Sequence, residues 1–287
     1  MESRNLNFIC LNGDIVPDKP LLNIQNRSFT YGDGLFETMR TRGTRILFLE
    51  QHYQRLCRSM ETLKMNTTAL PSTADIEACV SRLLYRNKFL KAARLRLTVF
   101  RNSGGFYCPQ NNDVQYCIES SPLENGSFSL NTKGLFIGIY NDIPKYPTSL
   151  AAIKSTSALL YVLAAAFAKQ NRFDDCLLIN HEGFLVEATS SNLFICKNGI
   201  IYTPPLSDGC LPGIMRDQII EIARQNGYDT VDNQSLTREF LAGATEVFLT
   251  NSIQGIQWVL AYNEDRYFNR LSKTLLEKLN NKAQITG

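Results

Sequence analysis

One stretch, residues 187–216, constrains this chain more than any other part of it. It begins with a single carboxylate, Glu187, in a Ser/Thr/Asn-rich run, continues through a strand and a turn, and reaches Gly213, where a helix is predicted to start. Apolar residues at helical spacing extend this helix to about Asn226, and Gly227 is a suitable C-cap. The free N–H groups of a helix start form an anion site. The combination of carboxylate, strand–turn and helix start is more informative than any one of them.

Composition describes a globular protein and excludes several classes. Hydrophobic residues make up 44% of the 287 and charged residues 20%, which is ordinary for a globular chain long enough for two domains. A net charge of +3 is too small to predict binding to nucleic acid or to a membrane surface. The N-terminal residues lack a signal peptide's apolar core, and no apolar run is long enough to span a bilayer. We therefore expect a cytoplasmic protein that binds neither nucleic acid nor membrane.

The spacing of the cysteines indicates neither a disulfide pattern nor a metal site. There are eight, scattered and without a Cys-x-x-Cys pair, and only two histidines accompany them, so no zinc or other metal site is expected. We expect reduced, mostly buried thiols, as is usual in the cytoplasm. The cysteines are Cys10, Cys57, Cys79, Cys108, Cys117, Cys176, Cys196 and Cys210.

Periodicity and composition along the chain predict its elements and its division. A segment rich in Ser, Asn, Gly and Pro is the best linker candidate. We therefore expect an N-terminal α/β domain over residues 1–120, a linker over 121–134 and a C-terminal domain over 135–287. The main expected strands are 7–11, 36–41, 45–49, 93–100, 135–140 and 245–252, and the expected helices are 50–63, 74–87, 158–167, 213–226 and 271–280.

Several notable residues have ordinary local explanations. Arg55, on a predicted helix, is by default a surface cation or an ion-pair partner. Lys154, just before a strongly apolar helix, is by default a surface lysine whose stem covers apolar surface. The run from Tyr31 through Gly-Asp-Gly to Phe36 by itself predicts only a tight hairpin loop. A lysine removed from water, however, has a lowered pKa and makes a good nucleophile.

In their order and spacing, residues 187–216 resemble the signature of the class IV pyridoxal-phosphate (PLP) enzymes. That family holds the branched-chain and D-amino-acid aminotransferases and 4-amino-4-deoxychorismate lyase. The resemblance covers nearly the whole chain, and it implies a homodimer with the two-domain D-amino-acid-aminotransferase-like fold, an α/β N-terminal domain and a barrel-like C-terminal PLP-binding domain. The pattern is filled by Glu187, Asn192-Leu193-Phe194, Ile201-Tyr202-Thr203, Leu211, Gly213-Ile214 and Arg216.

The resemblance also implies roles for individual residues toward pyridoxal 5'-phosphate. Lys154 would carry PLP and move the substrate's α-proton, and Glu187 would keep the pyridine nitrogen protonated. Arg55 would grip the phosphate, for which a guanidinium fork is well suited. The remaining cofactor contacts fall to Leu211 on the ring face and, around the phosphate, to Gly213, Ile214, Met215, Asn251 and Ser252.

For the substrate, the resemblance points to residues of the N-terminal half. Tyr31 and Phe36 would shape the substrate pocket, and Glu37 would hydrogen-bond within it. Basic residues at the end of strand 93–100 meet the substrate carboxylate in several relatives. We therefore expect Arg101, and after it Arg96, to anchor a carboxylate of an amino acid or of aminodeoxychorismate.

Two activities and one inactive alternative remain open. The run Arg101-Asn-Ser-Gly-Gly resembles the lyase branch and favours 4-amino-4-deoxychorismate lyase, which eliminates pyruvate and gives 4-aminobenzoate for folate synthesis. The alternative is an aminotransferase that acts on branched-chain or D-amino acids with 2-oxoglutarate, for which the PLP motifs would be the same. Relatives often have Asn or Tyr where Ser157 and Leu159 stand, which bears on substrate preference. The third possibility is a protein that binds PLP without catalytic activity. The joint presence of Lys154, Glu187 and Arg55 argues against it.

Overall fold

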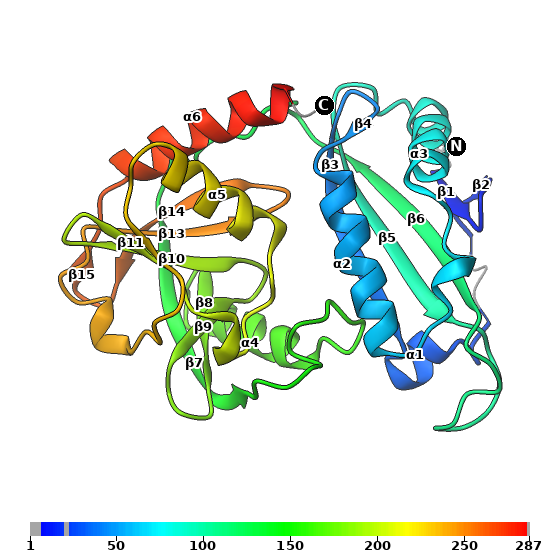
Figure 1. Cartoon of the computed structure of the whole chain (residues 1–287), viewed down its shortest axis with the longest axis horizontal. Coiled ribbons are helices and arrows are strands. Elements are labelled where there is room, and N and C mark those ends of the chain that lie inside the picture. The colour runs from blue at the N-terminus through cyan, green and yellow to red at the C-terminus, as the bar shows by residue number, and fades with distance from the viewer. Residues whose placement is uncertain (1–6, 20–22, 286–287) are drawn as a thin grey trace. The chain divides into compact units, whose positions relative to one another are not determined.

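The structure is a computed structural model that describes residues 7–19 and 23–285. By its internal contacts the chain divides into two units, and Figure 1 labels most of their helices and strands. The first unit comprises residues up to Ser127 together with Lys154–Ser157, and the second comprises Phe128–Ile153 and Ala158–Ile285. The lysine predicted to carry the cofactor therefore groups with the first unit.

The first unit is an antiparallel sheet of six strands with helices packed against it. Its elements are β1 (Phe8–Leu11), β2 (Asp14–Pro17), α1 (Arg27–Tyr31), β3 (Gly34–Arg42), β4 (Arg45–Ile46), α2 (Leu49–Thr62), η1 (Thr67–Ala69), α3 (Thr73–Asn87), β5 (Ala93–Arg101) and β6 (Val114–Pro122). The strand order is β2-β1-β6-β5-β3-β4, and α2 packs on β3 (Figure 1). Asn12 and Gly13 join β1 to β2 with positive φ at both residues, 49° and 94°, as a type I′ turn requires.

The two long helices of this unit follow their predicted periodicity. The start of α3 is a capping box, in which Ser72 Oγ accepts from the N–H of Asp75 and the Asp75 carboxylate accepts from the N–H of Ser72. Ile76, Val80 and Leu83 then form its buried face. Both helices are confirmed to within one residue at each end, α3 by capping and apolar spacing together and α2, which has no side-chain cap, by apolar spacing.

One cysteine pair corrects the expectation that all thiols are reduced. Cys10 on β1 and Cys79 on α3 are linked by a disulfide, since α3 packs on β1 and brings these two buried side chains together. The two residues are 69 positions apart, so no spacing pattern in the sequence signals the pair. The other six cysteines are free.

The second unit is a sheet that closes on itself. Its elements are β7 (Leu135–Lys145), α4 (Leu159–Gln170), β8 (Asp175–Asn180), β9 (Leu185–Ala188), β10 (Asn192–Lys197), β11 (Ile200–Tyr202), η2 (Leu206–Asp208), α5 (Ile214–Gln225), β12 (Thr230–Val231), η3 (Arg238–Phe240), β13 (Glu246–Asn251), β14 (Gly255–Tyr262), β15 (Asp265–Arg266) and α6 (Arg270–Ile285). Strands follow the order β10-β13-β14-β7-β8-β9, and β9 pairs again with β10 to complete a six-stranded barrel. The barrel closes where Glu187 lies opposite Asn192, so the predicted carboxylate run forms the closing turn.

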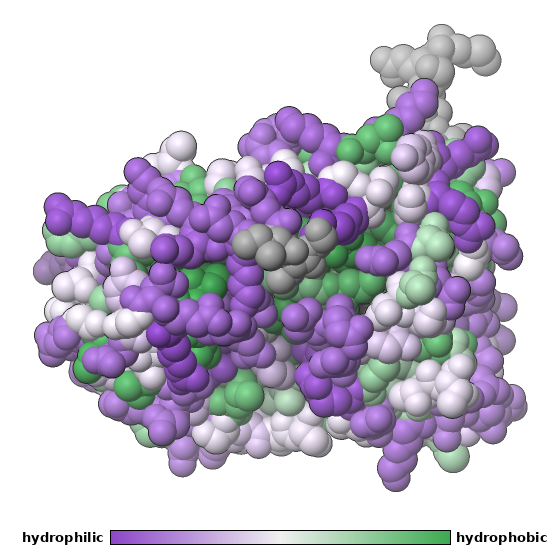
Figure 2. Space-filling model, turned by 45° about the horizontal axis from the view of Figure 1, so that its top comes forward, coloured by the Kyte–Doolittle hydropathy of each residue, from purple (hydrophilic) through white to green (hydrophobic). Residues whose placement is uncertain are grey.

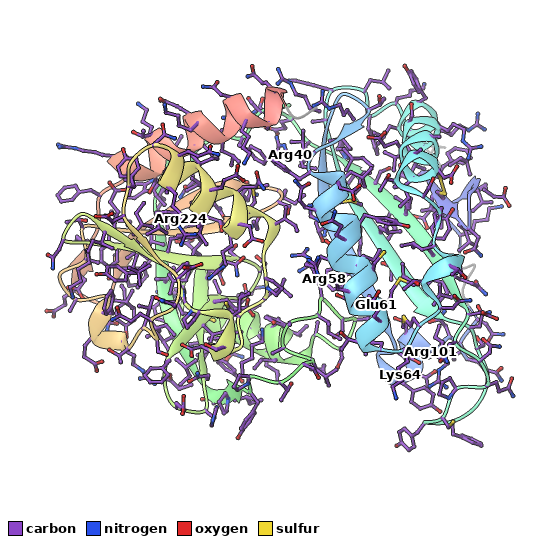
Figure 3. The ribbon with its side chains drawn as sticks, viewed as in Figure 1. Arg40, Arg58, Glu61, Lys64, Arg101 and Arg224 are labelled. Atoms are coloured by element: carbon purple, nitrogen blue, oxygen red, sulfur yellow. A yellow bond between two sulfur atoms is a disulfide. The ribbon has the colours of Figure 1, made fainter. Side chains whose placement is uncertain are left out.

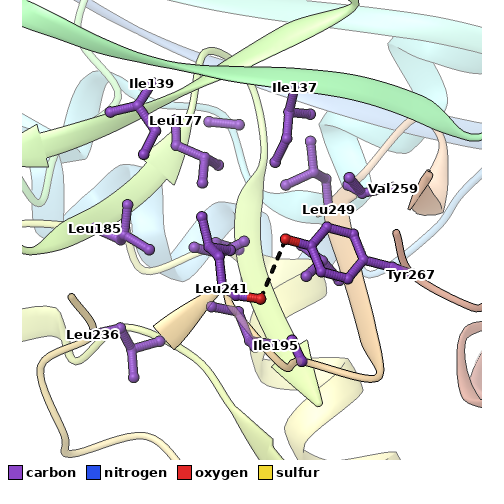
Figure 4. Close-up of a cluster of buried hydrophobic side chains, with 14 of the residues drawn as sticks. Ile137, Ile139, Leu177, Leu185, Ile195, Leu236, Leu241, Leu249, Val259 and Tyr267 are labelled. Carbon is purple, nitrogen blue, oxygen red and sulfur yellow. Dashed lines mark hydrogen bonds between the residues drawn. The ribbon is translucent and has the colours of Figure 1, made fainter. Parts of the chain in front are cut away.

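Apolar side chains fill the interior of this barrel (Figure 4). Leu193 and Ile195 on β10 and Val247 on β13 are fully buried there. Burying one such side chain contributes about 2 kcal/mol, so the cluster is the main driving force for closing the sheet. Tyr267 joins the cluster with its hydroxyl donating to the carbonyl of Leu241 at 3.3 Å, which satisfies its polar end.

Helix α5 begins and ends where the sequence predicts. Gly213 is its N-cap, and Gly227 follows the C-cap residue Asn226 with a φ of 78°, the left-handed conformation that ends helices. Ile219 and Ala223 lie fully buried on its apolar face. The end of the signature is therefore a helix fixed by glycines at both ends and by burial along one side.

The surface of the molecule is mostly hydrophilic on the face drawn in Figure 2, where apolar residues occur in small scattered groups. The longest helix, α6, has 16 residues and exposes Glu277 and Lys278. Across residues 7–19 and 23–285, no helix combines the length and the apolar character needed to cross a membrane.

Candidate active site

In the second unit, the carboxylate of Glu187 on β9 is surrounded by three donors. Lys145 Nζ lies 2.5 Å and Tyr161 Oη 2.8 Å from Oε1, and the N–H of Leu211 donates to Oε2 at 2.8 Å. Glu187 is only 3% exposed. A carboxylate removed from water is stable in its charged form only with such partners. We call Lys145, Tyr161, Glu187 and the N–H of Leu211 the Glu187 cluster.

Each partner of Glu187 comes from a different element. Lys145 ends β7, Tyr161 lies in the first turn of α4, and Leu211 lies in the loop before α5. Burial first, and then the charge of Glu187, raises the pKa of Tyr161 far above its ordinary value, so its hydroxyl remains a donor. Neither Lys145 nor Tyr161 was predicted from the sequence as a partner of Glu187. The available signals were weak: a tyrosine in an otherwise apolar helix, and the last cation before Lys154.

The start of α5 lies beside the closure of the barrel. Asn192 Nδ2 donates to the carbonyl of Leu211 at 2.9 Å, and a Cβ added to Gly213 would lie 1.8 Å from Asn192 Oδ1. Only glycine fits there. Gly213 as N-cap offers no side-chain acceptor, so the first-turn N–H groups, including those of Ile214 and Met215, have the arrangement of an anion site.

Replacing Gly213 with Ala should destabilise the protein by about 1–3 kcal/mol, because the new Cβ forces the Asn192 amide away from the carbonyl of Leu211. Urea unfolding measures the loss. The double variant Gly213→Ala/Asn192→Ala removes the obstructing amide and should show a smaller additional loss from the alanine at 213. Equal stability of Gly213→Ala and the parent would contradict the close packing.

The end of β13 contributes polar groups to the same unit. Asn251 Nδ2 donates to Ser191 Oγ at 2.9 Å, and its Oδ1 accepts from two backbone N–H groups of the turn that contains Ser252. Thr250 lies directly opposite Asn192 in the ladder and is 1% exposed. Its hydroxyl has no hydrogen-bond partner among the described residues. A buried hydroxyl of this kind, on the face that carries the Asn192 side chain, is suited to bind a ligand oxygen.

In the first unit, a second buried carboxylate is held by two residues of α2. Arg55 forms a bidentate pair with Glu37 on β3, Nε to Oε1 at 2.8 Å and Nη2 to Oε2 at 2.5 Å, and His52 Nδ1 lies 2.7 Å from Oε2. Burial by itself raises the pKa of Glu37, but the charge of Arg55 and the hydrogen bonds from His52 and Arg55 outweigh it and lower the pKa to about 2. The guanidinium predicted to grip the phosphate is therefore oriented by Glu37. Burial lowers the pKa of His52.

Lys154 is attached to β3 through its backbone. The N–H of Phe36 donates to the carbonyl of Lys154 at 2.8 Å, and the N–H of Thr156 donates to the carbonyl of Gly34 at 2.9 Å. Lys154 Nζ lies 4.6 Å from the centroid of the Phe36 ring, and the guanidinium carbon of Arg96 lies 3.7 Å from the same centroid. Two cations thus lie against one aromatic ring. We call Phe36, Arg96 and Lys154 the Phe36 cluster.

The glycines before Phe36 make room for the lysine segment. A Cβ on Gly32, whose φ is 68°, would lie 3.1 Å from Ser157 Cβ, and a Cβ on Gly34 would lie 3.1 Å from Thr156 Oγ1 and 2.7 Å from Ser28 Oγ. Tyr31, predicted to shape the substrate pocket, is 38% exposed and ends the short helix α1. The sequence predicted only a hairpin loop here, so this helix was missed.

Arg101 directs its guanidinium into its own unit. Its Nε donates to Asp33 at 3.0 Å, and its Nη1 donates to the carbonyl of Lys64 at 3.4 Å and to Asn112 Oδ1. Its Nη2 donates to the carbonyl of Leu63 at 2.7 Å. Figure 3 shows Arg101 and Lys64 next to each other. Arg27 also pairs with Asp33 and donates to carbonyls of the Gly-Gly loop that follows Arg101. Arg101 is 5% exposed, and its motif therefore has a structural explanation.

The chain belongs to a known enzyme family. The model of the family described as amino-transferase class IV matches residues 34–262. A provisionally named branched-chain-amino-acid aminotransferase of Methanocaldococcus jannaschii is 30% identical over 286 residues, which cover 94% of each chain. Enzymes of this family are transaminases or lyases that depend on PLP, so the predicted family, enzyme class and cofactor are confirmed.

Solved structures share the fold. A provisionally named 4-amino-4-deoxychorismate lyase of Legionella pneumophila matches with a TM-score of 0.82 and 26% identity, covering 92% of this chain and 96% of the other. The branched-chain aminotransferase of the thermophilic archaeon Thermoproteus uzoniensis, solved with norvaline, matches with a TM-score of 0.85 and 24% identity, covering 95% and 93%. The predicted fold, with its barrel-like second part, is confirmed.

Proposed function

We propose that this chain is an amino-acid aminotransferase that acts on branched-chain amino acids with 2-oxoglutarate as amino acceptor. The observation that carries the proposal is that Arg96 and Arg101 have different surroundings. Arg96 lies against Phe36 beside Lys154, whereas the donors of Arg101 are directed at Asp33 and its surroundings. Arg96 is thus the better carboxylate anchor near the reacting lysine. The name of the M. jannaschii relative supports the same choice.

The side chains present fit PLP. From the second unit, Glu187 offers a charged oxygen to a pyridine N–H, and the start of α5 with the buried hydroxyl of Thr250 suits a phosphate. In the first unit, Nε and Nη2 of Arg55 donate to Glu37, so Arg55 stays a proposed phosphate contact on the family resemblance alone. The further proposed contacts are Leu211 on the ring face, and Gly213, Ile214, Met215, Asn251 and Ser252 at the phosphate.

Two lysines are available, and their partners distinguish their roles. In PLP the pyridine nitrogen and the carbon that bears the aldehyde occupy opposite positions of the ring. Lys145 is bonded to Glu187, the proposed partner of the nitrogen, and therefore lies at the wrong end for covalent attachment. Lys154, held against Phe36, is the proposed point of attachment.

The proposed chemistry divides between the cofactor and the chain. PLP, when bound, supplies an electron sink that stabilises a carbanion at the substrate α-carbon. Glu187 accepts a hydrogen bond from the pyridine N–H and keeps that nitrogen protonated. Lys154 Nζ, once neutral, would accept the α-proton and would donate it to the former aldehyde carbon of the cofactor, which the substrate nitrogen separates from the α-carbon. Arg96 orients the substrate carboxylate, and Tyr31 and Phe36 shape the pocket around the side chain.

A pair of assays on the purified protein loaded with PLP tests the activity. One measures 2-oxoglutarate-dependent deamination of L- and D-amino acids, including the branched-chain ones. The other measures release of pyruvate and 4-aminobenzoate from 4-amino-4-deoxychorismate without an amino acceptor. Acceptor-dependent turnover of branched-chain amino acids is expected, and release without an acceptor would overturn the proposal.

The lyase remains the second candidate because of one motif. Arg101-Asn-Ser-Gly-Gly resembles the lyase branch, and the Legionella structure named as a lyase is 26% identical. The lyase would need Arg101 to release Asp33 and meet a substrate carboxylate. The second assay detects this activity directly.

Variants at the two arginines separate the candidates further. Arg96→Met should raise the KM for the amino acid about tenfold to a hundredfold with little loss of stability, since a charged hydrogen bond contributes about 1.5–3 kcal/mol. Arg101→Met should instead destabilise the protein, because Asp33 then faces only Arg27. Steady-state kinetics and urea unfolding measure the two effects. If Arg101→Met raised the KM and left stability unchanged, while Arg96→Met left the KM unchanged, Arg101 would be the carboxylate anchor.

We also propose a homodimer with a cytoplasmic location. Family resemblance supports the dimer, and size-exclusion chromatography with light scattering would test it. The six free cysteines support a reducing compartment, whereas the Cys10–Cys79 disulfide does not.

A further inference from the structure

We propose that Lys145 is a positioning residue that holds Glu187 charged and oriented, and thereby controls protonation of the cofactor's pyridine nitrogen. The inference rests on the proposed function, because it takes Glu187 as the partner of that nitrogen. It adds a residue that no signature motif contains, since Lys145 lies 42 residues before Glu187.

The geometry of Lys145 ties three parts of the second unit together. Its Nζ lies 2.5 Å from Glu187 Oε1 and donates to the carbonyl of Ala151 at 3.3 Å. It also lies 5.5 Å from the centroid of the Tyr161 ring. Lys145 is 6% exposed, so its stem is fixed by burial rather than free to move in solvent. One ammonium therefore fixes the end of β7, the closing strand β9 and the loop that leads to Lys154.

Lys145 is the cation that compensates the charge of Glu187. Of the other partners of Glu187, the Leu211 N–H is neutral, and Tyr161 keeps its proton. Burial, and then the charge of Glu187, raises the pKa of the nearby Cys210 thiol to about 12, so it is neutral as well. On α5, Arg216 directs Nη2 at the carbonyl of Pro204, 3.1 Å away, rather than at Glu187. Among the described residues, the charge balance of Glu187 therefore rests on one lysine.

Removing this charge should change how Glu187 responds to pH. A buried carboxylate without its cation takes up a proton at higher pH, since burial disfavours the charged form. A protonated Glu187 donates to the ring nitrogen instead of accepting from a pyridine N–H. Loss of Lys145 should therefore weaken PLP binding most at low pH and least at high pH.

The test is PLP affinity of the apo protein across pH 6 to 9, measured by fluorescence quenching, together with the absorption spectrum of bound PLP. The variants are Lys145→Met, Lys145→Gln and Lys145→Arg, and Lys169→Met is the matched control because Lys169 is exposed on α4. When the pH is lowered from 9 to 6, the PLP affinity of Lys145→Met and Lys145→Gln should fall by a factor at least about ten times larger than the fall in the parent. Lys145→Arg should restore the parent's pH profile, and Lys169→Met should not differ from the parent.

The outcomes separate this inference from the proposed function. If the parent does not bind PLP, the proposed function fails and the inference with it. If the parent binds PLP and Lys145→Gln shows the same affinity and spectrum at every pH, only the inference is overturned. A uniform loss of affinity at all pH values, unrelieved by arginine, would also overturn it, because it would reflect packing alone. Lys145→Gln keeps the side-chain donors and provides the readout if Lys145→Met does not fold.

Discussion

Lys154→Ala is expected to lower kcat on the order of 10⁴-fold or more, because it removes both the proposed attachment point of PLP and the base that moves the α-proton. The substitution should leave the fold intact, since Lys154 is attached to β3 through backbone hydrogen bonds that Ala also makes. The 2-oxoglutarate-dependent assay measures kcat, and far-ultraviolet circular dichroism checks the fold.

Covalent labelling gives an independent test of the same lysine. Borohydride treatment of the protein loaded with PLP should fix the cofactor to the peptide that contains Lys154, as read by mass spectrometry. Lys169→Ala is the matched control and should keep both activity and label. A fully active Lys154→Ala, or a label on Lys145, would refute the assignment.

Local sequence patterns predicted the elements that depend on local physics. Helix α5 was placed correctly because Gly213, the apolar spacing and Gly227 all indicate the same boundaries. The helix α1 was missed, although its N-cap Asn26 accepts from the N–H groups of Ser28 and Phe29. At five residues it is too short for periodicity to show, and the glycines after it favoured a loop.

Contacts between distant residues could not be predicted from the chain alone. Glu187 was identified by its motif, but its pairing with Lys145 follows from closure of the barrel and has no local pattern. Likewise, Arg101 was interpreted as a substrate anchor because nothing in the sequence shows that it meets Asp33 across 68 residues. Glu187 and Arg101 could both be singled out from the sequence. Their partners, Lys145 and Asp33, could not, because the topology of the fold decides which distant residues meet.

The residue five positions after Lys154 is not a tyrosine in this chain. Leu159 occupies that position here and begins α4, exposed to solvent. Tyr161, two residues further along the helix, directs its hydroxyl to Glu187 at 2.8 Å. The hydroxyl beside Glu187 therefore comes from Tyr161, in the first turn of α4.

Glu37→Gln is expected to destabilise the protein by about 3–5 kcal/mol, the usual cost of removing one partner of a buried ion pair. The variant leaves the guanidinium of Arg55, 5% exposed, without its bidentate acceptor, and it removes the charge beside His52. Urea unfolding at pH 7 measures the loss. Glu61→Gln on the exposed side of α2 is the matched control and should change stability little.

The same pair predicts an acid-dependent loss of stability. The pKa of Glu37 is lowered from 4.5 to about 2 in the folded protein, because Arg55 and His52 outweigh the opposing effect of burial. Its contribution, about 3 kcal/mol, is thus fully present above pH 4.5 and is lost as the pH falls toward 2. Burial also lowers the pKa of His52 from 6.5, so stability begins to fall below about pH 6.5. Urea unfolding between pH 7 and pH 3 should therefore show a steeper decline for the parent and Glu61→Gln than for Glu37→Gln. Equal slopes would mean that Glu37 is not held ionised by Arg55.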